Sequence, residues 1–175
     1  YSGDDAGKGM YEGITKQAKE IGLEVVAEQV PFGAEDVSAA VMKVLSSDVD
    51  VVAICAMQNT FLTIAKELGK QGNSAPAITS YVNVGPTFYS QFADDIAGKF
   101  DMYGPGWIDI TQGSDDLDNM TEYLAKVTTT NWGPSPYAIS GWLAGKYFVE
   151  GLSRIPEGQA ITWEAFMDAM ESKPI

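Results

Sequence analysis

Residues 49–57, VDVVAICAM, decide the fold of this chain, because the sequence on both sides of them is organised around a buried strand. The run from Val51 to Cys55 is continuously apolar and too short for a typical helix, as expected of a strand that is buried on both faces. Helix-period patterns lie on both sides of it. Strands that alternate with helices predict a parallel sheet with helices covering its faces.

The same alternation continues through the first hundred residues. Gly22 and Gly72 are natural helix stops, and Asp36 is a suitable helix cap. We expect helices at about 6–21, 37–45, 60–71 and 86–96, and strands at 23–30, 49–57, 77–81 and 99–103. This order predicts a doubly wound α/β lobe.

The pattern changes at Gly104, Pro105 and Gly106. Residues 107–110 could form a short extended segment, and the later pattern is helical only, at 115–127, 136–155 and 162–172. The aromatic-rich helix at 136–155 needs a partner to cover it, and the sequence offers no sheet after residue 110. We therefore expect the chain to end in the mostly helical part of a second lobe whose sheet is missing.

Composition excludes several classes of function. Acidic residues outnumber basic ones, 24 to 11, which argues against nucleic acid and against anionic membrane surfaces as partners. The chain has no histidine, so Ser–His and Cys–His catalysis and histidine-based metal sites are absent. The single cysteine, Cys55, excludes an internal disulfide, and its apolar strand predicts a core residue.

Two kinds of motif could indicate a cofactor or metal site, but neither fits such a site in detail. The glycine-rich stretch at 3–9, GDDAGKG, is one residue short of a phosphate loop, and Gly9 replaces the Ser or Thr that would hold magnesium. Acidic pairs such as Asp4–Asp5 and Asp115–Asp116 lie near helix starts, where acids favour the helix dipole. We expect no cofactor and no metal. The candidate ligand site is instead at Met57, Gln58 and Asn59, where the central strand ends, because open α/β sheets bind ligands outside the carboxyl ends of their strands.

The order of these pieces resembles the second half of type 1 periplasmic solute-binding proteins, the leucine/isoleucine/valine-binding family of ABC importers. The resemblance rests on several weak motifs in one order: DDAGKGM at 4–10, PFGAEDVSAAVMKV at 31–44, VDVVAICAM at 49–57, IAGKFDMYGP at 96–105 and PYAISGWLAGKYFVEGL at 136–152. The family implies two α/β lobes that are joined by a hinge and close on a small solute. By that comparison residues 1–104 are the ligand-binding lobe, with its first strand truncated to Tyr1 and Ser2. Residues 105–175 are the hinge crossover and the helical portion of the other lobe.

Carried over by position, the resemblance also names the ligand-facing residues, which are Asp5, Ala6, Met57, Gln58, Asn59, Tyr81, Val82 and Asn83. It places the hinge at Gly104, Pro105 and Gly106. Ala6 stands where many members have an aromatic residue that stacks on the ligand. Tyr81 falls about where the amino-acid binders place an acid for the ligand ammonium. Without that carboxylate a charge-assisted hydrogen bond is lost, so branched-chain amino acids should bind poorly.

The resemblance implies a non-enzymatic, extracytoplasmic solute-binding protein, or a fragment of one, that is periplasmic or extracellular with or without a lipid anchor. Its partners would be a small organic, amino-acid-like solute and the membrane subunits of an ABC importer. Two alternatives stay open: a ligand-sensing domain of the same fold in a receptor or regulator, and a flavodoxin-like or Rossmann-like enzyme. We also expect the chain to be a piece of a longer protein, or to cover its exposed surfaces by self-association.

Overall fold

The computed structural model describes residues 1–106, 108–109, 112–127 and 135–174 of the 175-residue chain. The chain separates into two units, Tyr1–Trp107 and Ile108–Ile175. The predicted extended segment at 107–110 lies partly outside the described residues. Each unit is described by itself.

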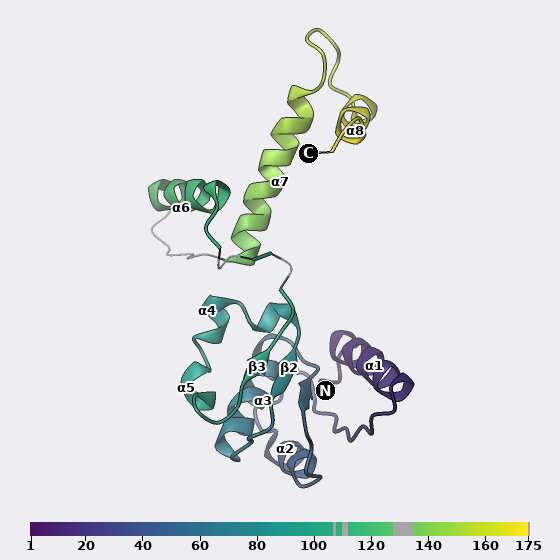
Figure 1. Ribbon diagram of the computed structural model, residues 1–175, viewed down its shortest axis with the longest axis vertical. Coiled ribbons are helices and arrows are strands. Elements are labelled where there is room, and N and C mark those ends of the chain that lie inside the picture. Colours follow the sequence, from purple (N-terminus) through teal and green to yellow (C-terminus); the bar gives the residue numbers. More distant parts are fainter. Residues whose placement is uncertain (107, 110–111, 128–134, 175) are drawn as a thin grey trace. The chain divides into compact units, whose positions relative to one another are not determined.

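The first unit is built on a parallel sheet with the strand order β1-β2-β3 (Figure 1). Its strands are β1 (Val52–Ile54), β2 (Ala77–Thr79) and β3 (Met102–Tyr103). Its helices are α1 (Asp5–Glu20), α2 (Ser38–Leu45), α3 (Gln58–Lys70), the 3₁₀ turn η1 (Tyr81–Asn83), α4 (Pro86–Tyr89) and α5 (Ala93–Ile96). The predicted α/β fold with a parallel sheet is confirmed.

The core lies between the sheet and α3, which runs behind the strands in Figure 1. Ile54 of β1 and Phe61 and Leu68 of α3 are almost completely buried there. Phe92 meets the ring of Phe61 edge-on, with 5.2 Å between the ring centroids. Each large apolar side chain that is buried in this way contributes about 1.5–3 kcal/mol.

The strand expected at 23–30 does not form, and this prediction was wrong in extent. In this segment only Val30 forms a β-bridge, parallel with Ser2, and the Glu28 carbonyl accepts a hydrogen bond from the Tyr1 amino group (2.8 Å). Ser2 lies between two neighbours, because Val30 N–H donates to the Tyr1 carbonyl (2.9 Å) and Ser2 N–H donates to the Cys55 carbonyl (2.9 Å). A strand needs a neighbour along its whole length, and Tyr1 and Ser2 pair with only the end of this segment. Leu23 is accordingly 58% exposed.

The helix expected at 86–96 is divided into α4 and α5, and the predicted strands are shorter than expected. Phe92 stands at the break, with non-helical backbone angles at the N-cap of α5. Its side chain is 1% exposed and packs against Phe61, Phe88 and Tyr89. Burial of this ring thus accounts for the break between α4 and α5. The helical period of the sequence does not reveal such a break.

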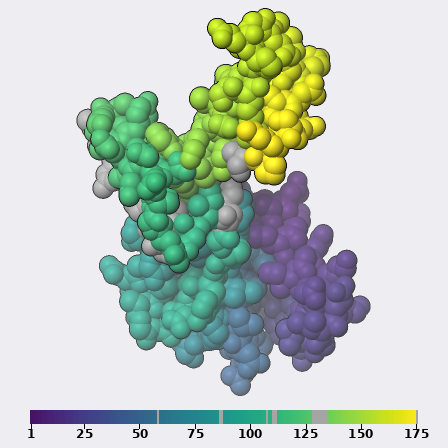
Figure 2. Space-filling view, turned by 45° about the horizontal axis from the view of Figure 1, so that its top comes forward, coloured from purple at the N-terminus to yellow at the C-terminus, as the bar shows by residue number. Residues whose placement is uncertain are grey.

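The described part of the second unit contains helices and no strand. These are α6 (Asp115–Val127), α7 (Pro136–Ser153) and α8 (Trp163–Glu171), and they match the predicted helices closely. Lys146 of α7 forms an ion pair with Asp116 of α6 (2.7 Å). Gly151 of α7 lets α8 approach closely, since a Cβ there would lie 2.6 Å from a Phe166 ring atom. The side chains of α7 and α8, light green to yellow, lie against one another in Figure 2. Within the described residues, no helix has the length and hydropathy needed to cross a membrane.

Candidate functional site

The predicted ligand residues lie on three segments that follow the strands of the first unit. Asp5 and Ala6 begin α1, just after the bridge at Ser2. Residues 57–59 follow β1 and begin α3, and residues 81–83 follow β2 as η1. Because the strands are parallel, their carboxyl ends meet at one edge of the sheet. The structure therefore brings all three segments to that edge.

Hydrogen bonds join the three segments to one another. Ser2 N–H donates to the Cys55 carbonyl (2.9 Å), which links the start of α1 to the end of β1. The Asn83 side-chain amide donates to the Ala56 carbonyl (2.8 Å), which links η1 to the same place. Residues 55–56 are thus the common anchor of the site.

The predicted residues differ in how far they reach solvent. Asp5, Ala6 and Asn59 are exposed, and Tyr81 is 42% exposed. Met57 and Val82 are half-buried, whereas Asn83 is fully buried. The side chain of Gln58 lies outside what the structure describes. A solute that approaches this edge would meet Tyr81 and the starts of two helices.

Those helix starts supply backbone donors. The N-cap residues of α1 and α3, Asp4 and Met57, make no side-chain cap hydrogen bond to their helices. Asp4 instead accepts a hydrogen bond from the Ser2 hydroxyl. The first N–H groups of a helix have no intrahelical partner and favour negative charge or carbonyl oxygens. The edge can therefore bind acceptor groups of a solute through the backbone.

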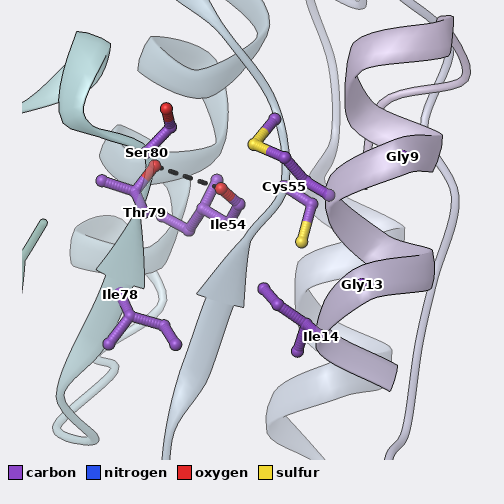
Figure 3. A pocket seen from close by; sticks show the side chains of 9 residues that line it. Gly9, Gly13, Ile14, Ile54, Cys55, Ile78, Thr79 and Ser80 are labelled. Atoms are coloured by element: carbon purple, nitrogen blue, oxygen red, sulfur yellow. Dashed lines mark hydrogen bonds between the residues drawn. The ribbon is translucent and has the colours of Figure 1, made fainter. Parts of the chain in front are cut away.

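A hollow of about 340 Å³ lies beside this edge, between α1 and the sheet (Figure 3). The hollow is lined by α1, by β1 and β2 and by the residue after each strand: Gly9, Met10, Gly13, Ile14, Ile54, Cys55, Ile78, Thr79 and Ser80. None of the predicted ligand residues lines it, although Ser80 directly precedes Tyr81. Burial raises the pKa of the Cys55 thiol, so the sulfur at this wall stays protonated.

Sequence reasoning missed this hollow because it depends on how α1 packs against the sheet. The available signal was the pair Gly9 and Gly13, four residues apart on one face of the helix. Neither glycine would place a Cβ within 4 Å of another atom. The helix face is open at this point.

The predicted hinge residues leave the sheet next to the site. Gly104, Pro105 and Gly106 are exposed and follow β3. A Cβ at Gly104 would lie 2.7 Å from a Val84 methyl group, so glycine allows the chain to pass close to the end of η1. Among the residues that the structure describes, no three metal-ligating side chains lie together.

The amino-acid sequence matches a family model described as periplasmic binding protein over residues 1–175. The chain belongs to the periplasmic binding protein family. Its fold is similar to that of solved structures of ABC transporter proteins. A branched-chain amino acid ABC transporter from Thermus thermophilus with bound valine has a TM-score of 0.72 and 19% identity, over 89% of this chain and 41% of that one.

An ABC transporter substrate-binding protein from Aeropyrum pernix has a TM-score of 0.66 and 17% identity, over 91% of this chain and 43% of that one. The chain thus spans less than half the length of either structure. No curated protein matches the sequence. At these identities the structures show the shared fold, and the predicted resemblance to the type 1 family is confirmed.

Proposed function

We propose that this chain is part of an extracytoplasmic solute-binding protein of an ABC importer, and that it binds a small organic solute at the carboxyl edge of its sheet. One observation carries the proposal: three segments of a family member meet at that edge, where Tyr81 is exposed and two helices begin without a side-chain cap hydrogen bond. Small-molecule sites combine a few placed polar groups of this kind with burial of the solute.

The proposed contact residues are those predicted except Asn83, whose side chain is fully buried, and Tyr81 is the proposed central side chain. We infer that a second lobe closes over the edge and that Gly104, Pro105 and Gly106 act as the hinge. The family supports a periplasmic or extracellular location. A binding role without chemistry is supported by the absence of histidine from the sequence and by burial of its only cysteine.

The solute can be identified by native mass spectrometry of the full-length protein after gentle purification. We expect one small organic molecule per protein. Its affinity would then be measured by calorimetry for Tyr81→Ala, which should weaken binding by roughly 1–3 kcal/mol through loss of a hydrogen bond and stacking surface.

Two further variants make this measurement specific. Tyr81→Phe keeps the ring and should retain the stacking part of the affinity. Tyr147→Ala removes a tyrosine of similar exposure on α7, 40% against 42%, and should leave binding unchanged. Unchanged affinity in a folded Tyr81→Ala protein would remove Tyr81 from the site.

Specificity follows from the neutral character of residue 81. Asp5 is the one charged side chain among the predicted ligand residues, and it lies on a different segment from Tyr81. We propose an amide, a hydroxyl compound or an aromatic acid as the solute class, with weak binding of leucine and valine. A thermal-shift panel of leucine, valine, phenylacetate and phenylacetamide tests this, and greater stabilisation by the branched-chain amino acids would contradict it.

A further inference from the structure

Asn83 differs from the other predicted ligand residues because its side chain is fully buried. Both hydrogens of its amide are used. One is donated to the Ala56 carbonyl (2.8 Å) and the other to the Thr79 hydroxyl (2.8 Å). A side chain in this position has no donor left to offer to a solute.

The Thr79 hydroxyl extends the connection to the strand. Having accepted from Asn83, it donates to the Ile54 carbonyl (3.1 Å), as the dashed line in Figure 3 shows. Asn83 N–H donates to the Ser80 carbonyl (3.0 Å), which closes the turn of η1 on itself. One side chain therefore joins the end of β1, the end of β2 and the turn that follows β2.

The side-chain oxygen of Asn83 shows which part of this side chain stabilises the site. Its Oδ1 is buried and has no hydrogen-bond partner among the described residues. A buried acceptor without a partner destabilises a protein, and an apolar side chain would avoid that cost. The two amide hydrogens are thus the part of this side chain that contributes.

We propose that Asn83 is a positioning residue of the solute site, which fixes residues 57–59 relative to residues 81–82 by clamping the Ala56 carbonyl to the end of β2. The role in binding rests on the proposed function, since those two segments carry the predicted solute contacts. The clamp itself is a property of the chain without solute.

Asn73 offers a matched control. It is also buried, at 3% exposure, and its amide donates to the Ala75 carbonyl (2.8 Å). It lies between α3 and β2, at the amino end of the strand rather than the carboxyl end. Loss of its side chain removes a comparable hydrogen bond without touching the site.

The test is backbone hydrogen exchange of the full-length protein without solute. In Asn83→Ala, exchange should rise by about tenfold or more in both peptides, 56–61 and 80–84, because one local clamp holds both. Asn73→Ala should leave both peptides at the wild-type rate. Thr79→Val keeps the shape of the side chain and removes the hydroxyl, and it should give a smaller rise in the same two peptides.

A rise confined to 80–84, or an equal rise in Asn73→Ala, would overturn the proposal. If Asn83→Ala does not fold, Thr79→Val tests the proposal instead. A rise in both peptides would support the clamp, and a rise confined to 80–84 would overturn it. Because no solute is present, joint loosening of both peptides would support the clamp even if the proposed solute binding failed.

Discussion

Gly7 lies where α1 passes closest to the sheet, and its lack of a side chain is required there. A Cβ at this position would overlap the Ser2 hydroxyl and carbonyl oxygens and lie 2.9 Å from the Cys55 carbonyl oxygen. We expect Gly7→Ala to lower the free energy of unfolding by about 1–3 kcal/mol, as overpacking does. Gly13 lies on the same helix with open space around it. Gly13→Ala should raise stability by up to about 1 kcal/mol, because alanine favours helix. Urea denaturation measures both, and equal effects would contradict this account of Gly7.

The expected weak binding of branched-chain amino acids depends on one side chain, that of Tyr81. Tyr81→Glu introduces a carboxylate at the position where the predicted resemblance expects amino-acid binders to have one. A carboxylate gives a solute ammonium a charge-assisted hydrogen bond, which is about twice as strong as a neutral one. We expect valine to stabilise Tyr81→Glu more than the wild-type protein in a thermal-shift assay. Tyr81→Gln is the control, because glutamine has the size of glutamate without its charge. Valine should stabilise this variant no more than the wild-type protein.

Cys55 should be unreactive in the folded protein. Its side chain is 3% exposed, and burial raises the pKa of the thiol, so the thiolate fraction at pH 8 is lower than that of a free cysteine. Ellman's reagent should label the native protein slowly and the urea-unfolded protein at once. Rapid stoichiometric labelling of the native protein would show that the hollow beneath α1 opens to reagents.

At the scale of elements, the sequence predicted helices better than strands. The helix period and glycine stops are local, so α1, α3 and α6 lie within two residues of expectation. The segment at 23–30 has strand-like side chains, but pairing depends on a neighbour, and only Val30 has one. The candidate site also has features that local sequence predicts and features that depend on distant neighbours. The order of strands and helices around the site was predictable, although β1 and β2 end at Ile54 and Thr79, earlier than expected. Burial of Asn83 was not, because it depends on the Ala56 carbonyl, 27 residues away.

The contact between α6 and α7 should depend on pH. Hydrogen bonding from Lys146 lowers the pKa of the Asp116 carboxyl, and the same contact raises the pKa of Lys146. The carboxyl therefore contributes stability above its unfolded pKa, which is lost as pH falls through the lowered folded pKa. The amine contributes below its unfolded pKa, and this is lost as pH rises through the raised folded pKa. Lys146 is exposed and Asp116 is half-buried, so salt should weaken the effect.

The Trp142 indole reports on this contact, because its Nε1–H donates to the Asp116 carboxyl (3.3 Å). We expect the indole N–H resonance of Trp142 to titrate with Asp116 at acidic pH, and this titration should vanish in Asp116→Asn. Glu122→Gln breaks the separate Glu122–Lys126 ion pair of α6 and should leave the titration intact. A Trp142 resonance that does not respond to acid would contradict the contact.

At the scale of the whole molecule, both units expose large apolar side chains. Phe148 is 54% exposed, Val149 63% and Trp163 71%. The backbone of 23–29 has no strand partner in the described structure. We propose that additional polypeptide or a second copy covers these surfaces, in agreement with the 41% share of the Thermus thermophilus structure that the chain covers.

The 175-residue chain on its own should therefore self-associate and bind the dye ANS. Size-exclusion chromatography with light scattering checks the mass, and the full-length protein under the same conditions is the control. A monodisperse 175-residue monomer without dye binding would show that the exposed side chains need no partner.

The central claim is that a small solute binds at the carboxyl edge of the sheet. Hydrogen exchange of the full-length protein, compared with and without its retained solute, tests that claim most directly. The account predicts that the solute slows exchange in the peptides covering 57–61 and 81–84. Slowing confined to residues 9–14 of α1, which line the hollow, or no slowing in either of the two peptides, would contradict it.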